Sequence, residues 1–188
     1  MDATLTLAIE QDSTNFGMEA QILRAWILGD KGAPNRSAKL MQDSIREFCS
    51  RGATGVSPYY MSLLAEAQAN ANALDDALAT IEAAQERGRL AGNRWCEPDL
   101  HRIRGEILSR MGYGNEAERS FIAALSRARA TEARGWELRA ATSLARLWSG
   151  QGRRVEAKQL LCPIHSGFSE GQDLPDLRDA EALLAELA

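Results

Sequence analysis

The stretch GEILSRMGYGNEAERSF, residues 105–121, holds the pattern that decides the fold. It begins at a small residue, Gly105, and reaches a second small residue, Ala117, twelve positions later, with Gly112 between them. The large apolar Phe121 follows four positions after Ala117. A small residue inside a helix lets a neighbouring helix approach closely, and a glycine between two helices tolerates the positive φ of a tight turn. The stretch therefore predicts two closely packed antiparallel helices.

The same pattern recurs every 40 residues without a gap. The first small position is held by Ala25, Ala65, Gly105 and Ala145, and the second by Ser37, Ala77, Ala117 and Ala157. The turn position is held by Gly32, Asn72, Gly112 and Gly152, and the large apolar position by Met41, Ile81, Phe121 and Leu161. A single helix pair cannot bury its apolar faces alone, so the pairs must stack on one another. The sequence thus predicts an all-α fold of stacked helix pairs.

This period divides the chain into repeats and places their helices. We expect helices over 15–31, 35–51, 57–72, 74–90, 96–112, 115–131, 134–151 and 153–165. We expect one array over 1–188, with the second helix of an incomplete repeat at 1–14, repeats at 15–54, 55–94, 95–133 and 134–168, and a capping helix within 169–188. Pro58 and Pro98 fall in the first turn of equivalent helices, where a missing N–H costs nothing.

The last segment has the features of a helix that closes an array. Asp173 is the expected N-cap, with Pro175 in the first turn. One apolar face is expected from Leu177, Ala180, Leu183, Leu184 and Leu187, and Ala185 falls on the 40-residue grid of small positions. Residues 166–188 carry six acids against Arg178, a net charge of −5. A polar outer face is what a terminal repeat needs, so this segment is predicted to be a cap.

Composition supports helices and excludes several classes of protein. The 188 residues include 31 Ala and 23 Leu but only 18 Val, Ile and Thr together, which is too few β-branched residues for a β-rich fold. No apolar run approaches the roughly 18 residues of a membrane helix, and the N-terminus lacks the pattern of a signal peptide. Three widely spaced cysteines, Cys49, Cys96 and Cys162, make no disulfide framework, so we expect a cytoplasmic protein.

Residues that could carry chemistry are few. No P-loop is present, and the lone Gly112-Tyr113-Gly114 falls on a repeat turn. His101 has no nucleophile or orienting acid in a recognisable pattern, and Cys162 with His165 would supply only half of a zinc site. We therefore expect no catalytic residue, no cofactor and no metal, although an enzyme acting through Cys, His or an Arg/Glu surface stays an alternative.

Nucleic-acid binding is a second alternative. Residues 102–158 contain twelve basic and six acidic side chains, a net charge of +6. Arginines on helix faces are usually solvated or paired with acids, and the whole chain has a net charge of −4. This surface is more readily interpreted as solvated or peptide-facing.

The small, turn, small and large positions match the tetratricopeptide (TPR) signature, here Gly105-x2-Leu108 followed by Ala117-x3-Phe121, with a period longer than the usual 34 residues or so. Nearly the whole chain, most strongly from Pro58 to the end, further resembles the C-terminal TPR region of large bacterial adenylate/guanylate cyclase–ATPase proteins. This chain departs from that region at Gln68, where Tyr is usual, and at Asn72-Ala73, where Gly-Arg is usual. The resemblance implies a right-handed α-solenoid and a non-catalytic regulatory or scaffolding segment of a signalling protein.

In that family the first helix of each repeat lines a concave groove that binds a peptide or another domain. The resemblance places on this wall Trp26, Tyr59, Ser62, Glu66, Asn70, Arg102, Glu106, Arg139, Thr142 and Arg146, with Glu19, Ile22, Asp30, Asp99 and Arg110 beside them. Glu66 and Glu106 stand where a clamp for a peptide's C-terminal carboxylate would need Asn, so that subclass is disfavoured.

We expect the arginines at one end of this groove, with Glu106 as the main nearby acid, to attract an acidic segment with an apolar anchor. Trp26 and Tyr59 would offer aromatic area at the other end. The partner is a protein or peptide, which could be upstream domains of the same polypeptide. The acidic tail could also compete for the arginines in a second copy, so a homo-oligomer stays open.

Overall fold

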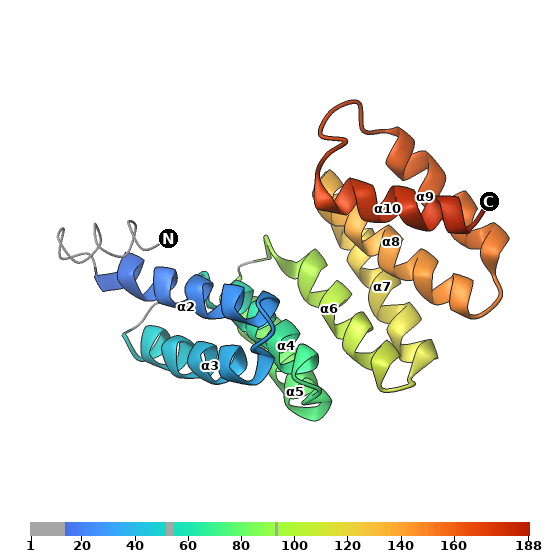
Figure 1. Cartoon of the computed structure of the whole chain (residues 1–188). Coiled ribbons are helices and arrows are strands. Elements are labelled where there is room, and N and C mark those ends of the chain that lie inside the picture. Colours follow the sequence, from blue (N-terminus) through green and yellow to red (C-terminus); the bar gives the residue numbers. More distant parts are fainter. Residues whose placement is uncertain (1–13, 52–54, 93) are drawn as a thin grey trace. The chain divides into compact units, whose positions relative to one another are not determined.

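The structure is a computed structural model that describes residues 14–51, 55–92 and 94–188. Every regular element in these ranges is an α-helix (Figure 1). The helices are α2 (Thr14–Asp30), α3 (Pro34–Ser50), α4 (Ser57–Asn70), α5 (Leu74–Leu90), α6 (Glu97–Arg110), α7 (Gly114–Ala130), α8 (Arg134–Gly150), α9 (Arg154–Ser166) and α10 (Pro175–Glu186). The helix pairs predicted from the 40-residue period are confirmed to within two residues at each end. The element predicted over 1–14 lies, apart from Thr14, outside the described residues.

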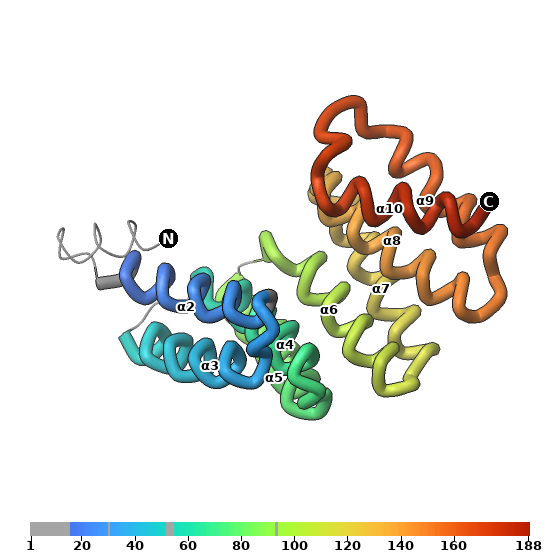
Figure 2. The backbone as a smooth tube through the Cα atoms, in the orientation of Figure 1, coloured from blue at the N-terminus to red at the C-terminus, as the bar shows by residue number. Residues whose placement is uncertain are grey.

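The chain divides into two compact units, Met1–Cys96 and Glu97–Ala188, which we call unit 1 and unit 2. In unit 1 α2 packs on α3, α3 on α4, and α4 on α5. In unit 2 α6 packs on α7, α7 on α8, and α8 on α9, with α10 against both α8 and α9. Within each unit, the backbone trace in Figure 2 shows successive helices turning back beside one another. Each unit is therefore built like an α-solenoid, and the single array over 1–188 stays a prediction.

The small positions of the repeat lie buried at helix contacts, as the sequence predicted. Relative exposure is 0% for Ser37, Ala65, Ala77, Ala117, Ala145 and Ala157, and Gly105 is also buried. At Gly105 the contact leaves no room for a side chain, because a Cβ there would lie 2.5 Å from Cε1 of Phe121. The large residue of the second helix thus packs directly on the small residue of the first.

The turns inside the helix pairs repeat as closely as the helices do. The turn residues Gly32, Asn72, Gly112 and Gly152 all have positive φ, between 62° and 87°. The backbone N–H groups of Ala33, Ala73, Tyr113 and Arg153 donate to the carbonyls of Leu28, Gln68, Leu108 and Trp148, respectively. This is the bond that closes a helix C-terminus in a Schellman turn. The turn at Asn72 therefore has the same backbone geometry as the three glycine turns, despite the departures from the family pattern at Gln68 and Asn72. The side-chain Oε1 of Gln68 is buried without a hydrogen-bond partner.

A second positive-φ position, which the sequence analysis missed, lies between successive helix pairs. Gly92 has φ 65° and Glu132, one period later, has φ 52°. The 40-residue spacing could have revealed the position, but the glutamate at 132 hides it because glutamate rarely adopts this conformation.

The C-terminal helix covers the end of the unit 2 core. Leu177, Ala180, Leu183 and Leu187 are at most 5% exposed and Leu184 is half-buried, so the predicted apolar face is confirmed. One detail was wrong. The N-cap is Leu174 in an extended conformation rather than Asp173, and no side chain caps the helix. Ala185, which falls on the grid of small positions, is exposed.

None of the helices in the described ranges has the length and apolarity needed to cross a bilayer.

Candidate functional site

The first helices of the unit 2 pairs, α6 and α8, together with α10 carry a network of charged side chains. On α6, Arg102 pairs with Asp99 at 2.7 Å and with Glu106 at 2.6 Å. Arg139 of α8 reaches back to Asp99 at 3.3 Å and lies 3.9 Å from Asp176 of α10. The three helices are thus joined by ion pairs, with Asp99 shared between two arginines.

Arg146 completes the network on the α10 side. It pairs with Asp179 of α10 at 2.8 Å. The structure therefore brings the three arginines singled out from the sequence to one cavity of about 150 Å³, which Arg102, Arg139 and Arg146 line together with Asp176 and Asp179. The expectation that Glu106 would be the main nearby acid was wrong. Spacing along one helix could have paired Asp99 with Arg102, but it could not show that Asp99 would also reach Arg139 or that Asp176 and Asp179 of α10 would reach the arginines of α8.

The three arginines differ in burial, and this separates their roles. Arg102 and Asp99 have side chains only 6% and 3% exposed, so their ion pair is a fixed part of the packing between helices. Arg146 and Asp179 are 53% and 55% exposed, and an ion pair so open to water contributes little to stability. Arg139, at 31%, is intermediate.

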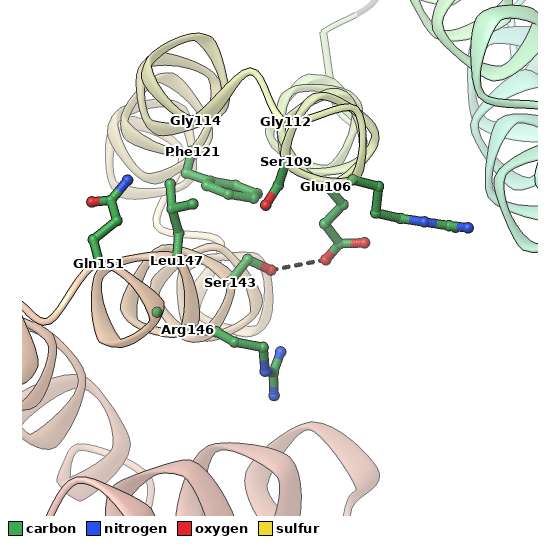
Figure 3. Close-up of a pocket in the computed structure, with 11 residues that line it drawn as sticks. Glu106, Ser109, Gly112, Gly114, Phe121, Ser143, Arg146, Leu147 and Gln151 are labelled. Atoms are coloured by element: carbon green, nitrogen blue, oxygen red, sulfur yellow. Dashed lines mark hydrogen bonds between the residues drawn. The ribbon is translucent and has the colours of Figure 1, made fainter.

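A larger pocket of about 600 Å³ lies next to this cavity and shares Glu106, Ser143 and Arg146 with it (Figure 3). Its apolar lining includes Phe121 and Leu147, and its polar lining includes Ser109 and Gln151. The turn glycine Gly112 and the helix-end Gly150 also border it, so there is no side chain at these two places to fill the space. We call the pocket and the adjoining cavity the unit 2 groove.

Two charged groups of the groove keep unused bonding capacity. Arg102 and Ser143 both donate to the same oxygen of Glu106, Oε1, at 2.6 and 2.9 Å, and the other carboxylate oxygen is turned away from Ser143 (Figure 3). Arg110 is exposed, lines the pocket and forms no ion pair among the described residues. The groove thus offers both a hydrogen-bond acceptor and a cation beside an apolar floor.

Positions equivalent to Arg102 are buried in the other repeats as well, although Thr142 lines the same cavity as Arg102. Ile22, Ser62 and Thr142 occupy this place in the other repeats, and all three are at most 3% exposed. The hydroxyl of Ser62 donates to the carbonyl of Tyr59, and that of Thr142 donates to the carbonyl of Leu138. Ser62 and Thr142, which were placed on the groove wall, therefore have their hydroxyl donors engaged within their own helices.

The pocket uses a wider stripe of each helix than the sequence analysis assigned. Ser109, Phe121, Ser143, Leu147 and Gln151 line it but were missed. On α8, Ser143 lies four positions after the predicted wall residue Arg139, and Leu147 lies four positions after Ser143. Residues four apart share a helix face, so continuing the predicted stripe in steps of four would have found both.

The remaining predicted wall residues belong to unit 1. Tyr59 is half-buried, with ring centroids 5.3 Å from Trp95 and 5.8 Å from Tyr60. Trp26 packs against the core, Glu66 is half-buried, and Asn70 is exposed. Unit 1 thus has an aromatic wall where unit 2 has a charged one, and the continuity of the two walls stays a prediction.

Glu19 has a defined role in this aromatic cluster. Burial and the neighbouring Glu19 carboxylate, to which the phenol is hydrogen-bonded, raise the pKa of Tyr60 to about 12. Tyr60 also packs edge-on against Phe48 with centroids 5.6 Å apart. Phe48 and Tyr60 are thus a packed part of the core, whereas Tyr59 is half-buried and Trp95 is 44% exposed.

Of the residues noted in the sequence for their chemistry, His101 lies on α6, and Cys162 and His165 lie one turn apart on α9. His101 is mostly buried near Glu97, and its pKa is lowered chiefly by burial, against the opposing effect of Glu97. Cys162 is exposed on α9 while Nε2 of His165 is buried without a partner. Within the described ranges no three His, Cys, Asp or Glu side chains are grouped so that they could hold a metal ion.

Comparison with solved structures shows a fold shared with TPR-like repeat proteins. The chain is similar to a protein of Podosopora anserina described as a putative kinesin light chain with nearly identical TPR-like repeats, at a TM-score of 0.69 and 15% identity over 90% of this chain and 84% of that one. A single-substitution variant of the same protein gives a TM-score of 0.70 at 14% identity over the same shares. No family model and no curated protein matches the sequence. The fold is thus an all-α, TPR-like solenoid.

Proposed function

We propose that the chain is a non-catalytic protein-interaction scaffold and that the unit 2 groove binds a peptide or domain of a protein partner. TPR-like repeats typically bind protein partners along the first helices of their pairs. The observation that carries the proposal is the pocket of about 600 Å³ lined by α6, α7 and α8, next to a charged cavity lined by α6, α8 and α10. An apolar floor with a few polar groups at its rim is the usual composition of a binding pocket.

A peptide is favoured over a small metabolite because the groove extends along the helices. The two cavities share lining residues, so an extended or helical segment could contact both. Ser109 and Gln151 could bond to its backbone, while Phe121 and Leu147 contact an apolar side chain.

A binding experiment with blocked and unblocked grooves tests this proposal. Ser109→Trp places a large side chain in the pocket, and Ser126→Trp makes the same change at an exposed site on α7 outside it. Fluorescence anisotropy with a library of short synthetic peptides should find binders to the unmodified chain and to Ser126→Trp. Those peptides should lose affinity for Ser109→Trp. Equal binding by both variants would contradict a role for this groove.

The resemblance to cyclase–ATPase proteins suggests a more specific role. We propose that the chain serves as the regulatory C-terminal segment of a larger signalling protein of that type, with an upstream domain as its partner. The gene sequence upstream of the Met1 codon tests this directly. An open reading frame that continues into cyclase or ATPase sequence is the expected result. A true start at Met1 would instead indicate a free-standing TPR adaptor.

Nucleic-acid binding is the second candidate, because residues 102–158 carry a net charge of +6. Pairing of Arg102, Arg139 and Arg146 with carboxylates argues against a phosphate-binding surface. Titration with labelled oligonucleotides over a range of salt concentrations separates the two functions. Tight binding with a steep log–log salt slope would favour nucleic acid.

A further inference from the structure

We infer that the segment bound in the unit 2 groove carries a carboxylate next to an apolar side chain, and that this carboxylate takes the place of Asp179 on Arg146. The inference rests on the proposed function and names the chemistry of its ligand. It depends on three features of the groove: an exchangeable ion pair, an acidic helix already seated on the arginines, and an apolar floor beside them.

The ion pair of Arg146 is the exchangeable one. Both of its side chains are more than half exposed, so water screens the attraction and either partner can be replaced at little cost. Arg102, in contrast, is 6% exposed and holds two carboxylates, so its pairs are fixed. A ligand carboxylate would therefore exchange at Arg146 and leave Arg102 unchanged.

The α10 helix shows which kind of segment this wall accepts. Asp176 and Asp179, one turn apart on α10, lie 3.9 Å from Arg139 and 2.8 Å from Arg146, respectively. The segment around them, residues 166–188, has a net charge of −5, whereas residues 102–158, which include both arginines, have a net charge of +6. An acidic segment is thus the natural complement of the wall, and α10 occupies part of the place that a ligand would use.

The arginines select the carboxylate of the ligand, and the large pocket selects the apolar side chain beside it. Phe121 and Leu147 lie on one side of it, and Arg146 points away from them, as Figure 3 shows. Arg110 adds a cation with no ion pair among the described residues. Arg146 and Arg110 line the same pocket as Phe121 and Leu147. A ligand with an apolar side chain against Phe121 and Leu147 and a carboxylate beside it thus has two cations to pair with, and bidentate charge-assisted bonds favour the carboxylate over an amide.

The experiment uses the full chain and matched synthetic peptides. The probes are fluorescein-labelled Gly/Ser peptides with one leucine and one glutamate at varied spacing, and the same peptides with glutamine or lysine instead of glutamate. We expect the glutamate peptides to bind about tenfold more tightly than the glutamine ones, the size of one charge-assisted hydrogen bond.

Two pairs of variants locate the carboxylate. Arg146→Ala should remove the preference for glutamate, whereas Arg119→Ala, which deletes a 73% exposed arginine on α7, should keep it. Asp179→Asn should tighten glutamate peptides about threefold by releasing Arg146. Glu181→Gln makes the same charge change at an exposed site of α10 and should leave the affinity for glutamate peptides unchanged.

The outcomes separate this inference from the proposed function. Peptides that bind the groove without preference for glutamate, or with a preference that survives Arg146→Ala, would overturn the inference and leave the peptide-binding function standing. Asp179→Asn and Glu181→Gln with equal effects would overturn the exchange at Arg146. Failure of every peptide to bind, including the glutamine and lysine sets, would overturn both.

Discussion

Tyr59 and Arg139 occupy the same position of the 40-residue repeat, one in each unit, and make different contacts. Tyr59 packs against the rings of Trp95 and Tyr60. Arg139 pairs with Asp99 and approaches Asp176. Further along the same wall, Trp26 in unit 1 packs on the core while its counterpart Glu106 in unit 2 lines the pocket.

The comparison shows which positions of the repeat tolerate different chemistry. The small positions are buried in every described repeat, so their size is fixed by the contact between helices. The wall positions are partly open, and there aromatic, acidic and basic residues are all accommodated on the same backbone. Binding chemistry can thus differ between units without a change of fold.

The largest expected effect comes from removing α10, which has no counterpart among the described helices of unit 1. Deleting residues 173–188 would expose the core covered by Leu177, Leu183 and Leu187. Three buried leucines at about 1.5–3 kcal/mol each give an upper estimate of about 5–9 kcal/mol. We expect aggregation and loss of cooperative unfolding, measured by size-exclusion chromatography and thermal denaturation. A monomeric truncation with unchanged stability would contradict the capping role.

A smaller effect is expected at the small position that differs between the units. Gly105→Ala would press a Cβ against Phe121 and should destabilise by about 1–3 kcal/mol in chemical denaturation. Adding Phe121→Ile recreates the pair of Ala65 and Ile81 in unit 1 and should recover part of this loss. Gly135→Ala, at a helical glycine with open space around it, is the control and should cost nothing.

The turn between helix pairs offers a stabilising change. Glu132 has φ 52° where Gly92 of unit 1 has φ 65°. Glu132→Gly should stabilise the chain by about 1 kcal/mol, because glycine adopts positive φ without steric cost. Glu132→Ala removes the same side chain but keeps the strain, so its urea midpoint should not rise. Equal midpoints for the two variants would show that φ is not the cause.

The smallest effect concerns pH. His101 stands where unit 1 has Met61, and its pKa is lowered mainly by burial. His101 is therefore harder to protonate in the folded chain than in the unfolded chain, where its pKa is about 6.5. The contribution of His101 to the free energy of unfolding is fully present above about pH 6.5 and is lost as the pH falls through the lower pKa of the folded chain. Denaturation curves at about pH 7.5 and about pH 5.5 should show this loss, and His101→Met should reduce it. A pH dependence unchanged by His101→Met would assign it to other groups.

The groove could be predicted only in part from the sequence. The period placed Arg102, Arg139 and Arg146 on equivalent helices, and they do line one cavity. It could not show that Asp99 would reach Arg139 or that Asp179 would reach Arg146, because ion pairs between helices depend on side-chain geometry rather than on spacing. Helical spacing could have placed Ser143 and Leu147 on the wall, but the pocket that they line depends on how α6, α7 and α8 pack.

The sequence by itself determined the helices, the turns and the buried small positions. Each of these depends on short-range rules: Gly32 and Asn72 accept positive φ, and Ala77 and Ala117 allow close approach, wherever the chain goes next. The tertiary structure alone decided which arginine is fixed and which is exchangeable. Burial sets that difference, because Arg102 is enclosed between helices while Arg146 stays in water, and burial is a property of the packed molecule.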